Sequence, residues 1–242
     1  MYLKTQAVVL RRIPYNDHSY IVSFYSFENG RLDSIQYGIK AGKRNAGLAY
    51  FEPLNVVDLV IEKKNGKSLS RIVEAKMNAT SGLGWMDPAK NAIAFFLAEC
   101  LYRILRESTV DRELYHFIKR SVDLLNSLNR GVANFHLAFL LQMTKYLGFY
   151  PNTEHNSNVV FFDMLNGVFV AERPTHSFYL ASEESNLLFK LLRMNYLNMH
   201  FFRFSRQERV QILDHLLNYY RIHLPEFGTI SSLSVLTDLF DT

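Results

Sequence analysis

Hydrophobic residues in the first third of the chain fall in five short runs rich in valine, isoleucine, tyrosine and phenylalanine. The runs are TQAVVLRR, SYIVSFYSF, RLDSIQYGI, LNVVDLVIEKK and LSRIVEAKM. Asn-Gly, the strongest short hairpin signal, follows the second run at Asn29-Gly30 and the fourth at Asn65-Gly66. Five short strands in about 80 residues predict a small β-barrel, and the five-stranded OB-fold has this size and strand count.

Apolar residues recur at helical spacing in the rest of the chain. Asp87 before Pro88 predicts a helix start, with an N-cap followed by proline at the first helical position. Further helical patterns follow at 111–128, 132–147, 182–194 and 205–223. A segment at about 158–171 predicts a small β-hairpin. We therefore predict an α+β chain with an OB-fold domain at 1–80 and a mainly helical domain at 81–242, into which the hairpin is inserted.

The positive charge of the chain is concentrated at its N-terminal end. The chain has 27 Lys and Arg and 23 Asp and Glu, a formal net charge of +4. Residues 1–80 contain 12 of the basic and 7 of the acidic residues, so this segment carries +5 and the remainder −1. This asymmetry indicates an anionic partner for the segment, and plain solubility is the alternative that charge alone leaves open.

The stretch GIKAGKRNAG, residues 38–47, contains Lys40, Lys43 and Arg44 and no acidic residue. It is not a P-loop, because only three residues separate its first two glycines and no hydroxyl residue follows the lysine. The next residues, LAYFEPLNVV, predict a strand instead of the helix that a P-loop requires. We therefore predict an inter-strand loop whose cations bind the phosphates of a nucleic-acid backbone.

Other basic residues of the predicted barrel lie among tyrosines. Arg11 and Arg12 end the first run, and Lys63 and Lys64 precede a hairpin turn. The tyrosines are Tyr15, Tyr20, Tyr25, Tyr37 and Tyr50. Cations that neutralise phosphates and rings that stack on unpaired bases are the combination that single-strand binding uses. A solvated hairpin tip for the lysines and a place in the barrel core for the tyrosines are the alternatives.

A second basic and aromatic cluster, HFFRFSRQER, spans residues 200–209. Its Arg203, Arg206 and Phe204 are candidates for binding an acidic peptide tail that ends in a ring, because arginine pairs with carboxylates and an apolar pocket takes the ring. The alternative is a loop that packs into the helical core before a helix that begins at Ser205.

Residue types for catalysis or metal binding form no recognisable constellation. The only cysteine, Cys100, lies in an apolar helical pattern that predicts a buried side chain, and no Gly-x-Ser-x-Gly motif occurs. The eight histidines are scattered, with His155 and His176 in polar loops. We therefore predict a protein that is not an enzyme and has no metal site. No apolar run reaches the roughly 20 residues of a membrane span, and the N-terminus lacks a signal-peptide pattern, so we expect a cytoplasmic, nucleoid-associated protein without a membrane partner.

Several motifs together resemble the bacterial recombination-mediator family RecO. They are AVVLRR, YNDHSYIVSFYSFENGRL and YGIKAGKRNAGLAYFEPL in the predicted barrel, LGFYPN at 147–152, and YYRIHLPEFGTISSLSVLTDLF at 219–240. The match covers essentially the whole chain in order. One departure concerns the four-cysteine zinc module that many family members have after the Leu-Gly-x-x-Pro element. Here that region reads TEHNSNVVFFDMLNGVF, without cysteine, so we predict that zinc is not retained as a cofactor.

The resemblance implies a protein that binds single- and double-stranded DNA, anneals complementary strands and, together with RecR, helps to load RecA onto strands coated by SSB. It associates the barrel with contacts to DNA and RecR, and the helical domain with docking of the acidic C-terminal tail of SSB. Carried onto this chain, it favours Lys40, Lys43 and Arg44 for DNA, followed by Arg11 and Arg12. It does not place the tail site residue by residue.

An RNA-binding OB-fold factor that acts on tRNA or ribosomal RNA is the alternative from a different recognition class. Competition between DNA and RNA oligonucleotides of equal length separates the two functions.

Overall fold

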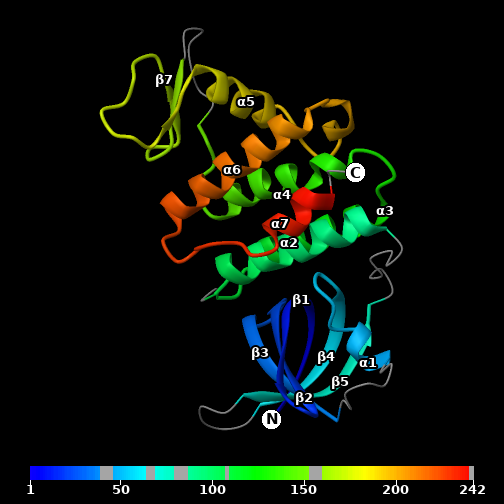
Figure 1. Ribbon diagram of the computed structural model, residues 1–242. Coiled ribbons are helices and arrows are strands. Elements are labelled where there is room, and N and C mark those ends of the chain that lie inside the picture. The colour runs from blue at the N-terminus through cyan, green and yellow to red at the C-terminus, as the bar shows by residue number, and fades with distance from the viewer. Residues whose placement is uncertain (39–45, 64–68, 79–86, 107–108, 153–159, 240–242) are drawn as a thin grey trace. The chain divides into compact units, whose positions relative to one another are not determined.

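The computed structural model forms two compact units, residues 1–128 with 229–242 and residues 129–228, coloured along the chain in Figure 1. It describes residues 1–38, 46–63, 69–78, 87–106, 109–152 and 160–239. The division into domains at residue 80 rests on the change in sequence texture and stays a prediction.

The first unit contains a closed barrel of five strands, as predicted for an OB-fold. Its strands are β1 (Tyr2–Asn16), β2 (Ser19–Ser26), β3 (Gly30–Tyr37), β4 (Val56–Glu62) and β5 (Ser70–Met77). They close in the order β1-β2-β3-β5-β4, and all pairs are antiparallel except β3 with β5. The parallel pair closes the barrel through Ser34 opposite Ser70 and Ile35 opposite Arg71. The predicted fold class is therefore confirmed.

The barrel core consists of inward-facing side chains that alternate along the strands. Val9 of β1 lies opposite Phe24 of β2, and both are fully buried. Phe24 meets the ring of Phe51 edge to face, with ring centroids 6.1 Å apart. A register shift at Leu10 then interrupts β1, so that Arg11 instead of Leu10 lies opposite Ser23. Such a bulge exchanges the faces to which the following side chains point.

The segment LAYFEPLNVV is not a strand throughout, and this part of the prediction was wrong. A short helix, α1 (Ala46–Ala49), precedes a turn, and β4 begins only at Val56. Proline at position 53 has no N–H for a ladder, and Leu54 has a positive φ of 62°. The Asn55 side chain donates to the Ala49 carbonyl at 2.8 Å and thereby holds the turn. Helix α1 is only four residues long, so the exclusion of a P-loop still rests on spacing and the missing hydroxyl.

Three helices complete the first unit: α2 (Pro88–Ile104), α3 (Arg112–Ser127) and α7 (Leu233–Leu239). The predicted Asp87 cap of α2 is confirmed, because its carboxylate accepts the backbone N–H groups of Ala89 and Lys90. Helix α2 packs against β1, and α7 lies beside α2 (Figure 1). Cys100 on α2 is buried as predicted, and burial raises the pKa of its thiol well above the usual value.

The second unit is helical with a small sheet. Its elements are α4 (Val132–Tyr146), β6 (Phe161–Asp163), β7 (Val168–Val170), β8 (Tyr179–Leu180), α5 (Ser182–Leu192), the 3-10 helix η1 (Met199–Phe201) and α6 (Arg206–His223). Strands β6 and β7 form the predicted hairpin, and β8 adds an edge strand that the sequence pattern did not predict. Ser205 and Glu208 cap α6 reciprocally, as the capping-box pattern predicts. Within the described residues, no helix has both the length and the apolar character needed to cross a membrane.

Candidate nucleic-acid interface

The basic loop at Lys40, Lys43 and Arg44 lies outside the described residues, as does Lys64, so these candidates stay sequence predictions. Lys63, which directly follows β4, is exposed. Its backbone N–H donates to the Met1 carbonyl at 2.9 Å, and its ammonium group lies 3.3 Å from the side-chain oxygen of Asn29. Lys63 therefore borders the β2–β3 turn and the start of β1.

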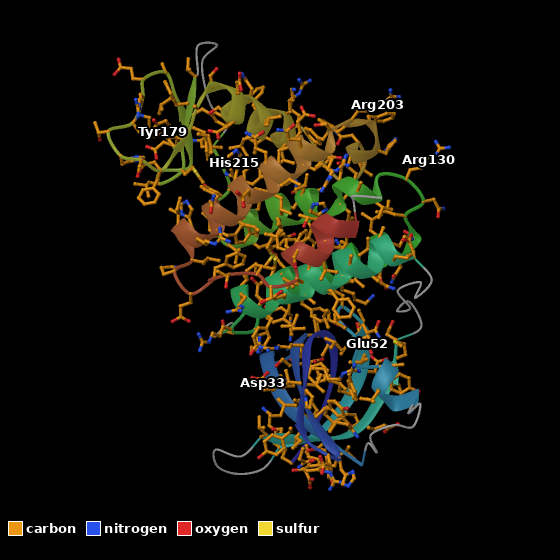
Figure 2. The ribbon with its side chains drawn as sticks, viewed as in Figure 1. Asp33, Glu52, Arg130, Tyr179, Arg203 and His215 are labelled. Atoms are coloured by element: carbon orange, nitrogen blue, oxygen red, sulfur yellow. The ribbon has the colours of Figure 1, made fainter. Side chains whose placement is uncertain are left out.

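Arg12 is held by contacts within the barrel. Its guanidinium donates to the Leu48 carbonyl at 2.7 Å and forms an ion pair with Glu52 at 3.0 Å; Figure 2 labels Glu52. It also lies 5.7 Å from the centre of the Tyr20 ring. These contacts link the end of α1 to β1. We therefore infer that the main role of Arg12 is to stabilise the barrel.

Replacing Arg12 with alanine is expected to lower the free energy of unfolding by about 1–3 kcal/mol, because a charge-assisted hydrogen bond and an ion pair are lost together. Urea unfolding followed by circular dichroism measures the change. Arg11→Ala is the matched control, since Arg11 loses only a ring contact and should cost less than about 1 kcal/mol. Equal losses of unfolding free energy in Arg12→Ala and Arg11→Ala would contradict the structural role inferred for Arg12.

Arg11 directly precedes Arg12 on β1, so its side chain points to the opposite face of the strand, where it is exposed. Its guanidinium carbon is 4.9 Å from the centre of the Tyr102 ring on α2. Arg31 of β3 lies 4.4 Å from the same ring, but its charge is paired with Asp33 at 3.2 Å. Among the described residues, no carboxylate pairs with Arg11. Of the two predicted barrel arginines, Arg11 is thus the one whose charge is available to an anion.

The tyrosines of the barrel divide into buried and exposed rings. Tyr25 is fully buried, and Tyr20 and Tyr50 are partly buried against the barrel core. These three rings therefore pack in the barrel, which was the alternative to a role in base stacking. Tyr15 and Tyr37 are 60% and 44% exposed and remain available for stacking.

The exposed rings lie at loop ends that OB-folds use for binding. Tyr15 is near the β1–β2 turn, and Tyr37 ends β3 directly before the basic loop. Arg71, at the start of β5, lies 5.7 Å from the Tyr37 ring. OB-folds bind oligonucleotides on the face of their second and third strands and through the loops that join strands 1 and 2 and strands 4 and 5. Arg71 was not predicted from the sequence, since nothing local distinguishes it from other strand arginines.

A cleft of about 470 Å³ opens beside Arg11. Its lining residues come from β1, the turn between α1 and β4, α2 and the segment before α7: Leu10, Arg11, Arg12, Pro53, Phe95, Glu99, Tyr102, Arg103, Ser231 and Ser232. The α2 residues were missed by sequence reasoning because their spacing is that of an ordinary core helix. The one local signal is Phe95, which lies next to Phe96 but off the buried stripe and is 48% exposed.

The candidates for a peptide-binding site lie in the second unit. Phe204 is only 8% exposed, and its ring lies 5.9 Å from that of Phe202. Arg203 and Arg206 are both exposed, and Figure 2 labels Arg203. Because Phe204 is buried, its ring packs in the unit and does not present a surface for a partner. The two arginines stay predicted contacts.

The region of the missing cysteines contains a hydrogen-bonded turn. Asp163 accepts the backbone N–H groups of Leu165 and Asn166, and His176 Nε2 lies 3.3 Å from its carboxylate. Partial burial acts to raise the pKa of Asp163, but hydrogen bonds from Asn166, His176 and Leu165 outweigh it and lower the pKa. Within the described ranges, no three metal-ligating side chains gather, whereas His155 lies outside them. The predicted absence of zinc stays a prediction.

Comparison with known proteins adds to this geometry. The family models described as Recombination protein O N terminal and Recombination protein O C terminal match residues 1–80 and 86–232. A DNA repair protein RecO from Phocaeicola vulgatus is 41% identical over 240 residues, which cover 99% of this chain and all of that protein. Proteins of the same name from Bacteroides fragilis and Porphyromonas gingivalis are 39% and 38% identical, each over the full length of both chains.

Proposed function

Because the chain belongs to the RecO family, whose members act in DNA repair and recombination, we propose that it is a recombination mediator that works without catalysis. In this proposal it binds and anneals single-stranded DNA and, together with RecR, helps to load RecA onto SSB-coated strands. It also contacts double-stranded DNA and works without a zinc cofactor.

The observation that carries the proposal is the basic and aromatic surface of the barrel. Arg11 offers a charge that no described carboxylate neutralises, and Tyr15 and Tyr37 offer exposed rings. Tyr37 directly precedes the stretch 38–47, whose sequence contains three cations and no acidic residue. Cations bind phosphates in a salt-dependent manner, and each ring that stacks on a base contributes on the order of 1–3 kcal/mol. These are the two contributions that single-strand binding requires.

Annealing follows from the kind of contact that this surface makes. Arginines and lysines on phosphates position a strand without reading its sequence. Tyrosine rings stack on base faces, and the hydrogen-bonding edges of the bases stay open. A complementary strand can therefore pair while the first strand is still bound, and the positive surface offsets the repulsion between the two backbones.

Partner binding is proposed for the second unit. An acidic SSB tail carries negative charge and an apolar end, which fits exposed Arg203 and Arg206 by charge. Since Phe204 is buried, the pocket for the apolar end must come from other side chains. RecR contacts are proposed for the barrel, on the basis of the family resemblance alone.

The test is a titration of fluorescent single-stranded DNA at several salt concentrations. We expect affinity to fall steeply with salt, and Arg11→Glu to weaken binding about fivefold near 0.1 M salt, since one phosphate contact contributes about 0.7 to the salt slope of a single strand. Arg130→Glu, an exposed charge reversal in the second unit, should bind like the wild type (Figure 2). Affinity independent of salt, or stronger binding to an equal-length RNA competitor, would refute the proposal.

A further inference from the structure

The cleft beside Arg11 has apolar walls and a basic rim. Leu10 and Pro53 line it together with the rings of Phe95 and Tyr102. Its volume of about 470 Å³ lies within the range of sites that enclose a small planar ligand, roughly 300–1,000 Å³.

Glu99, which lines the cleft, and Glu52, which neighbours the lining residue Pro53, already have partners. The Glu99 carboxylate accepts three hydrogen bonds, from the backbone N–H groups of Ser231 and Ser232 at 2.9 and 2.8 Å and from the Ser232 hydroxyl at 2.7 Å. Glu52 is paired with Arg12. Neither carboxylate therefore offers its full charge to the remaining cations of the rim.

Two arginines of the rim retain donors. Arg103 lies 3.9 Å from Glu99, at the limit of an ion pair, and its side chain is 36% exposed, so its guanidinium can also reach an anion in the cleft. Arg11 has no carboxylate partner there, and its guanidinium is held over the Tyr102 ring. A guanidinium fixed in this way presents its N–H groups in a planar fork, the geometry that fits a phosphate.

Phe95 supplies the aromatic surface. Its side chain is 48% exposed on a helix whose neighbouring apolar residues, Ala94 and Phe96, are buried. The Tyr102 ring is covered by Arg11 and Arg31, so it orients the cation and does not itself stack. An exposed ring next to the guanidinium groups of the rim matches the two parts of a nucleotide, its base and its phosphate.

We propose that this cleft binds one unstacked nucleotide of a single-stranded DNA, with its base on Phe95 and its phosphate on Arg11 and Arg103. The inference rests on the proposed DNA-binding function and assigns α2 a part in it. A base inside a duplex is paired and stacked between its neighbours, so only a single strand can place a base in the cleft. The cleft therefore makes the protein prefer single strands over duplexes.

The test compares Phe95→Leu, which keeps an apolar side chain but loses the ring, with Phe95→Tyr, which keeps the ring. Anisotropy titrations of the full chain use labelled oligo-dT and a duplex of equal length. We expect Phe95→Leu to weaken oligo-dT binding about fivefold or more, from the loss of one stacked base. Duplex affinity should change less than twofold, and Phe95→Tyr should bind oligo-dT like the wild type.

Controls separate stacking from folding and from the barrel surface. Phe189→Leu changes a helical phenylalanine of almost equal exposure, 49%, in the second unit and should leave DNA binding unchanged. Arg103→Gln should lower the salt slope for oligo-dT by about 0.7, because one phosphate contact is lost. Thermal unfolding of each variant checks that the fold is retained.

Each outcome decides between the two proposals. If the wild type does not bind oligo-dT, the proposed function itself fails. If the wild type binds and both Phe95→Leu and Arg103→Gln bind equally well, the cleft proposal fails while the function stands. If Phe95→Leu leaves oligo-dT binding intact but abolishes binding of an acidic peptide with a C-terminal phenylalanine, the cleft is a peptide site and the proposal is overturned.

Discussion

Reversing the charges of Lys43 and Arg44 together is expected to weaken single-stranded DNA binding by at least about 25-fold near 0.1 M salt. Each lost phosphate contact on a single strand lowers the salt slope by about 0.7, so two contacts lower it by about 1.4. Over the tenfold interval from 1 M to 0.1 M salt, a slope difference of about 1.4 gives a difference in affinity of about 25-fold. Annealing should slow accordingly, because fewer strands are bound at a given protein concentration.

The measurement is the slope of log affinity against log salt for the Lys43→Glu, Arg44→Glu double variant. Lys190→Glu with Arg193→Glu is the matched control, since both side chains are exposed in the second unit. An unchanged slope would show that the loop does not touch phosphates, even if the affinity itself had fallen. A lower melting temperature in the double variant alone would instead assign the loop a structural role.

Gly167→Ala is expected to destabilise the second unit by about 2–5 kcal/mol. Gly167 has a φ of +66°, which alanine adopts at a cost of roughly 1–2 kcal/mol. An added Cβ would lie 2.6 Å from the hydroxyl oxygen of Tyr219. That hydroxyl donates to the Phe149 carbonyl at 2.8 Å, and displacing it leaves a carbonyl unpaired at a cost of about 1–3 kcal/mol.

Gly148→Ala is the control for backbone strain. Gly148 also has a positive φ, 81°, but a Cβ there would meet no atom within 4 Å. The difference between the two variants in urea unfolding therefore isolates the contact with Tyr219. Burial raises the pKa of Tyr219, so its hydroxyl keeps its proton and the difference should not change between pH 6 and pH 9. Equal destabilisation by both variants would contradict the predicted clash.

The strands and helices could be predicted because their signals are local. The Asp87 cap and the Ser205 capping box each lie within four residues of the helix that they start. The segment after the basic loop was mispredicted because its apolar residues match a strand, whereas Pro53 and the Asn55 side chain impose a turn. Strand β8 is only two residues long, too short for a periodic pattern.

The candidate site could be predicted only in part. Arg11 and Arg12 are adjacent in the sequence and equivalent by residue type, yet they point to opposite faces of β1, and the bulge at Leu10 sets which face each one takes. Arg12 is paired with Glu52, whereas Arg11 has no carboxylate partner among the described residues and can pair with an external anion. Phe204 belonged to a basic and aromatic cluster by composition, but only packing revealed that its ring is buried.

The sequence by itself determined the barrel, the helical patterns, the concentration of positive charge in residues 1–80 and the resemblance to the RecO family, because each of these is carried by neighbouring residues or by ordered motifs. The tertiary structure decided which charges are free. It brings Phe95 and Arg103 of α2 and Ser231 from near the end of the chain beside Arg11 of β1. Arg11, the two α2 residues and Ser231 come from three parts of the sequence that are more than 80 positions apart, and no local pattern encodes a contact at that distance. Charge neutralisation and burial depend on such contacts, and so only the fold distinguishes a structural arginine from one that can bind DNA.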